Sequence, residues 1–196
     1  MDMALPDPNG PSGQADWASI FQRTLPYVDV FVPSIEEILF CLHRAQLEAW
    51  RGSLFQHLTL GYLDRLADEL LGMGVAIAGF KLGEYGLYLK AAGAERLAGL
   101  GQRLGLDVTD WAGARIYQQA FQVEVVGTTG AGDSAYAALL TALLKRLAPV
   151  EAARMACAVG ACNVEAADAS SGVRSWSATE ARLAAGWSSR NEVVHP

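Results

Sequence analysis

The chain has 196 residues, of which 52% are hydrophobic and 18% charged, and its formal net charge at pH 7 is −6. This composition excludes an intrinsically disordered chain and predicts a single globular domain over residues 1–196 with a substantial core. The lysines and arginines form no dense patch, which argues against nucleic acid as the main partner, and no apolar run is long enough to span a membrane.

Capping residues, turn residues and hydrophobic spacing predict alternating helices and strands along the chain. The expected elements, in chain order, are a loop over 1–15, a helix over 16–24 capped by Asp16, a strand over 28–33, a helix beginning at Ser34, an irregular stretch over 43–57, a helix over 58–73, a strand over 75–82 with its return strand over 86–90, an irregular stretch over 91–119, a strand over 121–126, helices over 135–147 and 150–168, and a last helix from Ser177 or Thr179. Such alternation is typical of a mainly parallel sheet with helices on both faces.

The three cysteines and three histidines predict no disulfide and no metal site. Cys157 and Cys162 are five positions apart on one expected helix and so point to different faces, and the histidines lack metal-ligand spacing. We expect small buried thiols in a reducing compartment. The start of the chain has no basic-then-apolar signal segment, so the cytoplasm is the expected location.

A glycine-rich turn over 126–134, Val-Gly-Thr-Thr-Gly-Ala-Gly-Asp-Ser, is the most informative stretch. It joins an apolar segment to a helix, where free backbone amides can hold an anion. The carboxylate of Asp133 then lies where it could accept the proton of an alcohol, an arrangement that suits phosphoryl transfer to a hydroxyl. A structural turn with an acid in the first helical turn is the alternative. The glycine spacing fits neither a Walker A loop nor a dinucleotide-binding fingerprint.

Four segments, which follow one another along the chain in the family's order, resemble the ribokinase-like (PfkB) carbohydrate kinases. They are Thr128–Asp133, which resembles the second family signature Asp-Thr-Thr-Gly-Ala-Gly-Asp; Val28–Glu37, which resembles an apolar strand followed by Pro-Asn-x-x-Glu; Lys81–Gly86, which resembles the Leu-Gly-x-x-Gly turn; and Ala156–Val173, which resembles a small-residue helix and the loop after it. The resemblance implies a three-layer α/β/α sandwich with a mainly parallel sheet. It covers the later part of the family pattern, without the usual N-terminal portion and lid.

In this family the acid of the second signature is the catalytic base, so the resemblance implies that role for Asp133. It implies an anion hole made by the backbone amides of Gly130, Ala131 and Gly132, with Thr128 also at the nucleotide. The small residues fit such a role, because larger side chains would crowd the phosphates. The cofactors implied are ATP and Mg²⁺.

The nucleotide-contacting turn of the family corresponds to Lys81, Leu82, Gly83 and Gly86. Lys81 adds a charge directed at the phosphates, or it is a strand-end lysine that faces water. Cys157 falls at the position of a base-contacting residue, or it is a packed helix residue. Asn163, with its free amide on the same helix, is a weaker candidate for contact with the nucleotide.

Glu37 matches the acid of the family's Asn-x-x-Glu motif, which organises Mg²⁺ and phosphate. One carboxylate is chemically adequate, because Mg²⁺ keeps much of its hydration shell. The alternative role for Glu37 is a capping box with Ser34. Ser34 stands where the family usually has Asn. Gly127 stands where the family has an Asp whose carboxylate resembles a ligand of a monovalent cation, so this chain is not expected to need K⁺ for activity.

Two functions from different classes remain open at this point. The first is an ATP-dependent kinase that acts on a hydroxyl of a sugar or sugar-like small molecule, with neither nucleic acid nor membrane as a partner. The second is a truncated or degenerate family member that binds a nucleotide or a partner protein without sugar turnover. A sheet without its early strands would expose an unpaired edge, which favours a homodimer.

Overall fold

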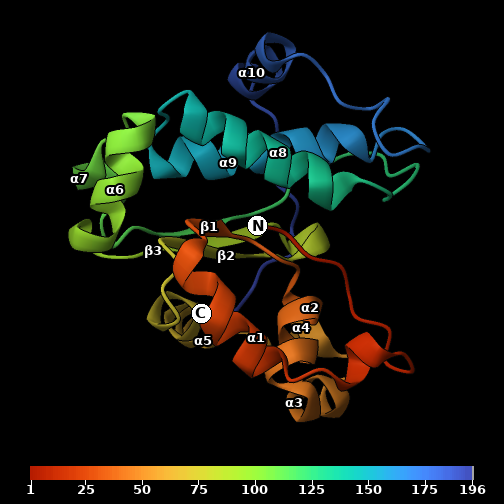
Figure 1. Ribbon diagram of the computed structural model, residues 1–196. Coiled ribbons are helices and arrows are strands. Elements are labelled where there is room, and N and C mark those ends of the chain that lie inside the picture. The colour runs from red at the N-terminus through yellow and green to blue at the C-terminus, as the bar shows by residue number, and fades with distance from the viewer. Residues whose placement is uncertain (196) are drawn as a thin grey trace.

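The computed structural model describes residues 1–195, and a four-stranded sheet lies between two layers of helices (Figure 1). The strands are β1 (Val30–Phe31), β2 (Ile77–Lys81), β3 (Leu87–Ala91) and β4 (Arg115–Gln118). The lower layer in Figure 1 contains α1 (Trp17–Thr24), α2 (Ile35–Leu42), α3 (Arg44–Ala49), α4 (Leu54–His57) and α5 (Leu60–Gly72). The upper layer contains α6 (Ala94–Leu104), α7 (Val108–Trp111), α8 (Ala131–Leu144), α9 (Pro149–Asn163) and α10 (Trp176–Ala184).

The sheet is mixed, with strand order β1-β2-β3-β4. β1 pairs with β2 in parallel, with Val30 opposite Ile77, whereas β2–β3 and β3–β4 are antiparallel. The expected α/β class with helices on both faces is confirmed, but the expectation of a mainly parallel sheet is wrong for residues 1–195. The turn between β2 and β3 is too short for a crossover, and a short turn allows only an antiparallel hairpin.

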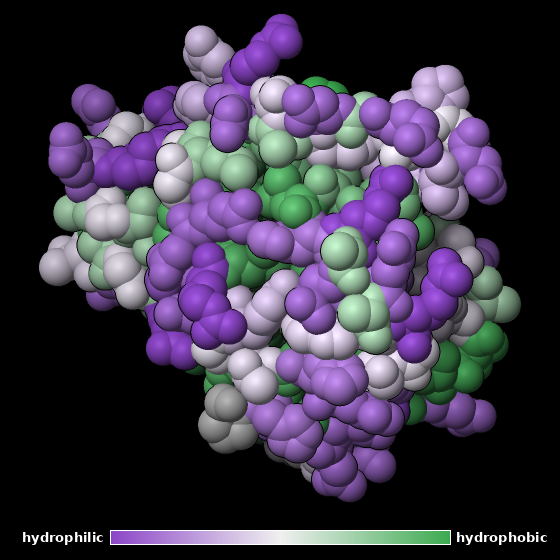
Figure 2. Space-filling model, turned by 90° about the horizontal axis from the view of Figure 1, so that it is seen from below, coloured by the Kyte–Doolittle hydropathy of each residue, from purple (hydrophilic) through white to green (hydrophobic). Residues whose placement is uncertain are grey.

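Side chains alternate between the two faces of the sheet, so each face has its own core. Ile77 and Leu89 point to the upper core, where they meet Leu139 and Leu143 of α8 and small residues of α9. Phe31, Phe80 and Tyr88 point to the lower core with side chains of α1, α2 and α5. Burial of both faces explains the largely apolar strands. The face of the molecule seen from below, formed by the lower layer, is mainly hydrophilic (Figure 2).

Capping signals in the sequence locate several helix starts. Asp16 caps α1 by accepting a hydrogen bond from the Ser19 amide, and Thr59 caps α5 in the same way through the Tyr62 amide. α8 begins at Ala131, earlier than the expected residue 135, because Gly130 adopts a left-handed conformation with φ of 76°. The last helix is capped by Ser175, two residues before the earlier of the two expected starts.

Three expected segments differ from the structure. The stretch 43–57, expected to be irregular, contains α3 and α4, and the stretch 91–119 contains α6, α7 and β4. Residues 121–126 do not form a ladder strand: within the described chain only Phe121 makes a bridge, to Ser189. This segment leaves the sheet to reach the glycine turn, and the amides of Val126 and Gly127 donate instead to the carbonyl of Val164 at the end of α9.

Both ends of the chain lie against the sheet region. Met1 pairs with β1 beside Phe31: its nitrogen donates to the Val30 carbonyl, and its own carbonyl accepts from the Val32 amide. The C-terminal segment, residues 187–195, runs from α10 in the upper layer to α5 in the lower layer. Its contacts are the stack of Trp187 on Phe121, the hydrogen bond from the Arg190 amide to Ala120, the burial of Val194 in the lower core and the hydrogen bond from the Leu60 amide to the His195 carbonyl. Within residues 1–195, no helix is both long and apolar enough to cross a membrane.

The hairpin turn between β2 and β3 generates a stability prediction. Gly86 has φ of 102°, and a Cβ there would lie 2.0 Å from the Gln118 carbonyl oxygen, whereas Gly83 has φ of 57° and open space around it. We expect Gly86→Ala to lower the free energy of unfolding by about 3 kcal/mol and Gly83→Ala by about 1 kcal/mol. Urea unfolding of the two variants measures the difference, and equal losses would contradict the close approach at Gly86.

Candidate active site

A cavity of about 740 Å³ lies where the sheet, α2, α8 and α9 meet. The N-terminal residues Met3, Ala4 and Leu5, Phe55 of α4 and Arg190 of the C-terminal segment contribute to its wall, and most of the wall comes from five other parts of the fold. They are the β2–β3 turn (Lys81, Gly83, Glu84, Gly86), the start of α2 (Ser34, Glu37), the start of α8 (Ala131, Gly132, Asp133, Ala135), α9 (Cys157, Gly160, Ala161) and the segment after β4 (Ala120, Phe121, Val123, Val125, Thr128). Nine of the twelve residues that the sequence singles out for catalysis or for cofactor or metal binding line this cavity; Leu82, Gly130 and Asn163 do not.

The glycine turn places the first turn of α8 at the wall of the cavity. The side chain of Asp133 is exposed and lines the cavity, and it makes no hydrogen bond to any of residues 1–195. The backbone amides of Gly132 and Asp133 also donate to no partner within the described chain. Unpaired amides at the start of a helix attract anions. The site therefore places a carboxylate without hydrogen bonds beside a helix end with two unpaired amides.

The anion hole differs in one respect from the expectation. The Ala131 amide was expected to be free, but it donates to the Thr128 carbonyl at 3.2 Å and so closes the turn. Gly130 shapes the turn through its left-handed backbone and does not line the cavity. The free amide of Asp133 was not predicted, although its place in the first helical turn is a general signal for an unpaired donor.

Asn163 supports the glycine turn from behind. It is fully buried at the end of α9, and its Nδ2 donates to the Thr129 carbonyl at 2.9 Å. Its Oδ1 has no hydrogen-bond partner among residues 1–195. Because Asn163 lies outside the cavity, the expected contact with a nucleotide does not fit; the side chain holds the turn in place.

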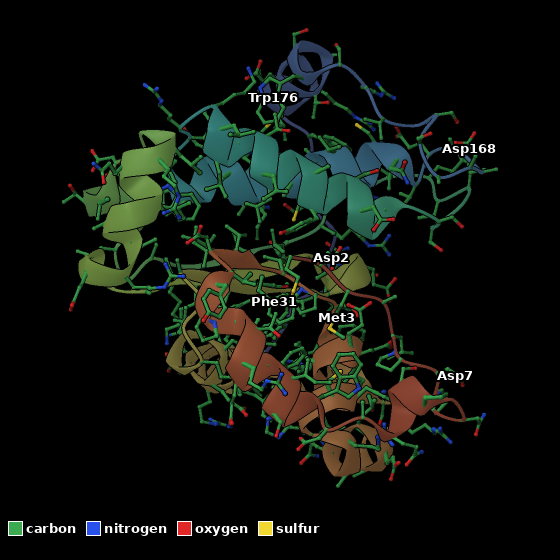
Figure 3. All side chains as sticks on the ribbon, viewed as in Figure 1. Asp2, Met3, Asp7, Phe31, Asp168 and Trp176 are labelled. Atoms are coloured by element: carbon green, nitrogen blue, oxygen red, sulfur yellow. The ribbon has the colours of Figure 1, made fainter. Side chains whose placement is uncertain are left out.

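Lys81 lies at the end of β2 and directs its ammonium to the start of α8. A Cβ at Gly132 would lie 3.5 Å from Lys81 Nζ. The ammonium forms an ion pair with both carboxylate oxygens of Asp2 at 2.7 Å, and the lysine side chain is only 14% exposed. The alternative of a lysine facing water is therefore wrong. Figure 3 shows Asp2 between the sheet and the helices α8 and α9. No sequence pattern pointed to Asp2.

Leu82, the next residue, is fully buried in the lower core, so its side chain supports the turn. Gly83 and Gly86 both line the cavity, as expected for a turn that lies along a ligand.

Ser34 and Glu37 form a complete capping box at the start of α2. Glu37 Oε2 accepts from the Ser34 amide at 2.6 Å, and Ser34 Oγ accepts from the Glu37 amide at 3.3 Å. The structural role is confirmed. Both residues also line the cavity, and Glu37 Oε1 has no hydrogen-bond partner in the described part of the chain. Across residues 1–195 no cluster of three His, Cys, Asp or Glu side chains could hold a metal ion, so the metal role of Glu37 stays a prediction.

The far wall of the cavity is apolar. Cys157 lines it, and burial raises the pKa of this thiol to about 12, so the side chain is a neutral, packed group. Phe121 and Val123 complete the wall. Arg190 was missed by the sequence analysis: it reaches the cavity from the C-terminal segment, where it pairs with Glu192 at 3.2 Å and Glu84 at 3.4 Å. Cys157 and Cys162 are both free, as expected.

Comparisons with known proteins agree with this geometry. The family described as "pfkB family carbohydrate kinase" matches residues 1–176. Ribokinase from Thermotoga maritima is similar in structure, with a TM-score of 0.58 and 24% identity over 83% of this chain and 44% of the other. A putative ribokinase II from E. coli, in complex with ATP and Mg²⁺, has a TM-score of 0.60 and 20% identity over 86% of this chain and 43% of the other.

Phosphofructokinase-2 from Escherichia coli, in complex with potassium, has a TM-score of 0.58 and 17% identity over 84% of this chain and 43% of the other. The chain thus spans less than half the length of these three structures. No curated protein matches the sequence. The ribokinase-like fold and the match over residues 1–176 lead to one conclusion: this chain belongs to the pfkB family of carbohydrate kinases.

Proposed function

We propose that this chain carries the nucleotide-binding and catalytic part of an ATP-dependent kinase that phosphorylates a hydroxyl of a sugar or sugar-like molecule. One observation carries the proposal: the Asp133 carboxylate, two unpaired amides of α8 and the Lys81 ammonium border a single cavity. Membership of the pfkB family supports it.

The residues present fit ATP and Mg²⁺. The apolar wall with Cys157 and Phe121 suits a planar base, and the start of α8 suits phosphates, since Gly132 leaves a space beside Lys81 that a side chain would narrow. Glu37, with one carboxylate oxygen free of hydrogen bonds in residues 1–195, would hold the hydrated Mg²⁺. Bound ATP supplies the phosphoryl group, and Mg²⁺ offsets its negative charge.

The side chains of the cavity have separate tasks in this proposal. Asp133 accepts the proton of the acceptor hydroxyl, because its carboxylate is free and adjacent to the anion-binding amides. The amides of Gly132 and Asp133 donate to the negative charge that develops during transfer, and Lys81 adds a positive charge beside them. The apolar wall excludes water, which would otherwise compete with the sugar as acceptor.

A second candidate is a chain that binds nucleotide, or a partner protein, without turning over sugar. The observation that favours it is the coverage of the similar structures, of which this chain matches 43–44%. The replacement of the family's Asp by Gly127 and of its Asn by Ser34 points the same way. We also propose that the chain forms a homodimer and that it is located in the cytoplasm.

The role of Asp133 is tested by Asp133→Asn. We expect phosphate transfer to a panel of pentoses, hexoses and nucleosides to fall by at least about 100-fold, because the variant lacks the proton acceptor. ATP affinity and the melting temperature should stay unchanged, since the side chain is exposed and makes no hydrogen bond within residues 1–195. Asp110→Asn, at an exposed position of α7, is the control. Undiminished transfer by the Asp133 variant would rule out its role as base.

Nucleotide binding is tested by Gly132→Asp, measured by isothermal titration with ATP and Mg²⁺. A side chain here would meet Lys81 and place a negative charge at the amides, so binding should be lost. Gly99→Asp is the matched control, because Gly99 is an exposed helical glycine of α6, an element that does not line the cavity. Binding that survives Gly132→Asp would show that the nucleotide lies elsewhere. If the unmodified chain binds no ATP, both the kinase and the nucleotide-binding chain without sugar turnover are contradicted.

A further inference from the structure

The glycine turn and the loop after α9 are in direct backbone contact. The amides of Val126 and Gly127 donate to the Val164 carbonyl at 2.8 and 3.2 Å. A Cβ at Gly130 would lie 2.3 Å from the Ala169 carbonyl oxygen. The loop therefore packs directly against the glycine turn that carries the unpaired amides. Interactions that fix the conformation of the loop also fix the conformation of the turn.

A monovalent cation bound by a carboxylate at position 127, as the family signature implies, does not fit these residues. Gly127 has no carboxylate, and a Cβ there would lie 2.9 Å from the carbonyl oxygens of both Ala166 and Ala167. These are backbone atoms, so an acid at this position would force the loop away. The acid of the loop itself, Asp168, accepts hydrogen bonds from the amides of Ser170 and Ser171 at 2.9 and 2.7 Å and closes a local turn. In Figure 3 Asp168 lies at the outer end of the loop, far from Asp2.

Fixed positive charges are already present beside this loop. Glu165 receives two hydrogen bonds from Arg182 of α10, both at 2.7 Å, and one from Arg174 at 2.9 Å. Arg182 lies over the Trp187 ring, 3.6 Å from its centroid, which fixes the guanidinium plane. The carboxylate and the Arg182 side chain are 23% and 25% exposed, so salt screens this bidentate pair less than a surface pair. Arg182 holds the pKa of the Glu165 carboxyl below its usual value.

We propose that the cluster of Glu165, Arg174 and Arg182 orders the loop and the glycine turn without a monovalent cation, so that nucleotide binding by this chain does not depend on K⁺. The guanidinium groups are covalently part of the chain, so they stay at the loop whatever salt is in solution, whereas a bound K⁺ ion would depend on the K⁺ concentration. The inference rests on the proposed function for its nucleotide readout. Its structural part, the order of the loop, is independent of that function.

The first test compares K⁺, Na⁺ and N-methyl-D-glucamine chlorides at equal ionic strength. We expect the same melting temperature of the ligand-free chain and the same ATP affinity in all three salts. A melting temperature or an affinity raised by K⁺ alone would overturn the proposal. If ATP binds in none of the salts, the proposed function fails, and the melting series still decides whether K⁺ binds and stabilises this chain.

The second test removes the charge of the cluster with Glu165→Gln. We expect ATP affinity to fall by about tenfold, because the loop loses charge-assisted hydrogen bonds to two arginines. Glu69→Gln is the matched control: it removes the same charge from an ion pair with His43, at 2.8 Å, outside the cavity. Arg174→Gln leaves the Arg182 pair in place and should give a smaller loss, which keeps the test informative if Glu165→Gln does not fold. Unchanged affinity in both Glu165 and Arg174 variants would refute the role of the cluster.

Discussion

The close approach of α8 to α9 is the constraint on which the rest of the site depends. α9 is buried along nearly its whole length and consists mostly of Ala, Gly and Cys. A Cβ at Gly160 would lie 3.2 Å from the Ala135 Cβ and 3.3 Å from the Ala131 carbonyl, so larger side chains would push the helices apart. Small residues let the two backbones pack closely, and close packing leaves α8 little freedom to shift. The position of Asp133 above the end of the sheet follows from this contact.

The glycine turn is held by backbone and amide contacts from α9 and its loop rather than by its own hydrogen bonds alone. Asn163 fixes the Thr129 carbonyl, and the Val164 carbonyl holds Gly127. The helix end can then keep two amides unpaired, which costs free energy that the surrounding packing offsets. In the proposed function, these two amides are in place for an anion before a ligand binds. Lys81 places its ammonium beside the same helix end, where an ion pair with Asp2 holds it.

Local signals in the sequence predicted what local physics decides. Asp16 and Ser34 cap helices because their side chains reach amides three residues ahead, and the β2–β3 hairpin follows from a short glycine-containing turn. The sequence did not predict α6, which starts at Ala94 after an N-cap, Gly93, that has no side chain to cap it, or β4, whose half-exposed residues show no apolar alternation. Asp2 reaches Lys81, and Arg190 reaches the cavity wall beside Glu84, only through tertiary folding. Asp2 is 79 positions from Lys81 in the sequence, and Arg190 is 106 positions from Glu84.

The path of the C-terminal segment has a consequence for the order in which the molecule is built. Residues 187–195 join the two helix layers, and Arg190 from this segment forms part of the cavity wall. Synthesis on the ribosome proceeds from the N-terminus, so the glycine turn and α8 leave the exit tunnel well before this segment does. The start of α8, with its two unpaired amides, is therefore made before the segment that adds Arg190 to the cavity wall. The cavity takes its full shape only when residues 187–195 bridge from α10 to α5.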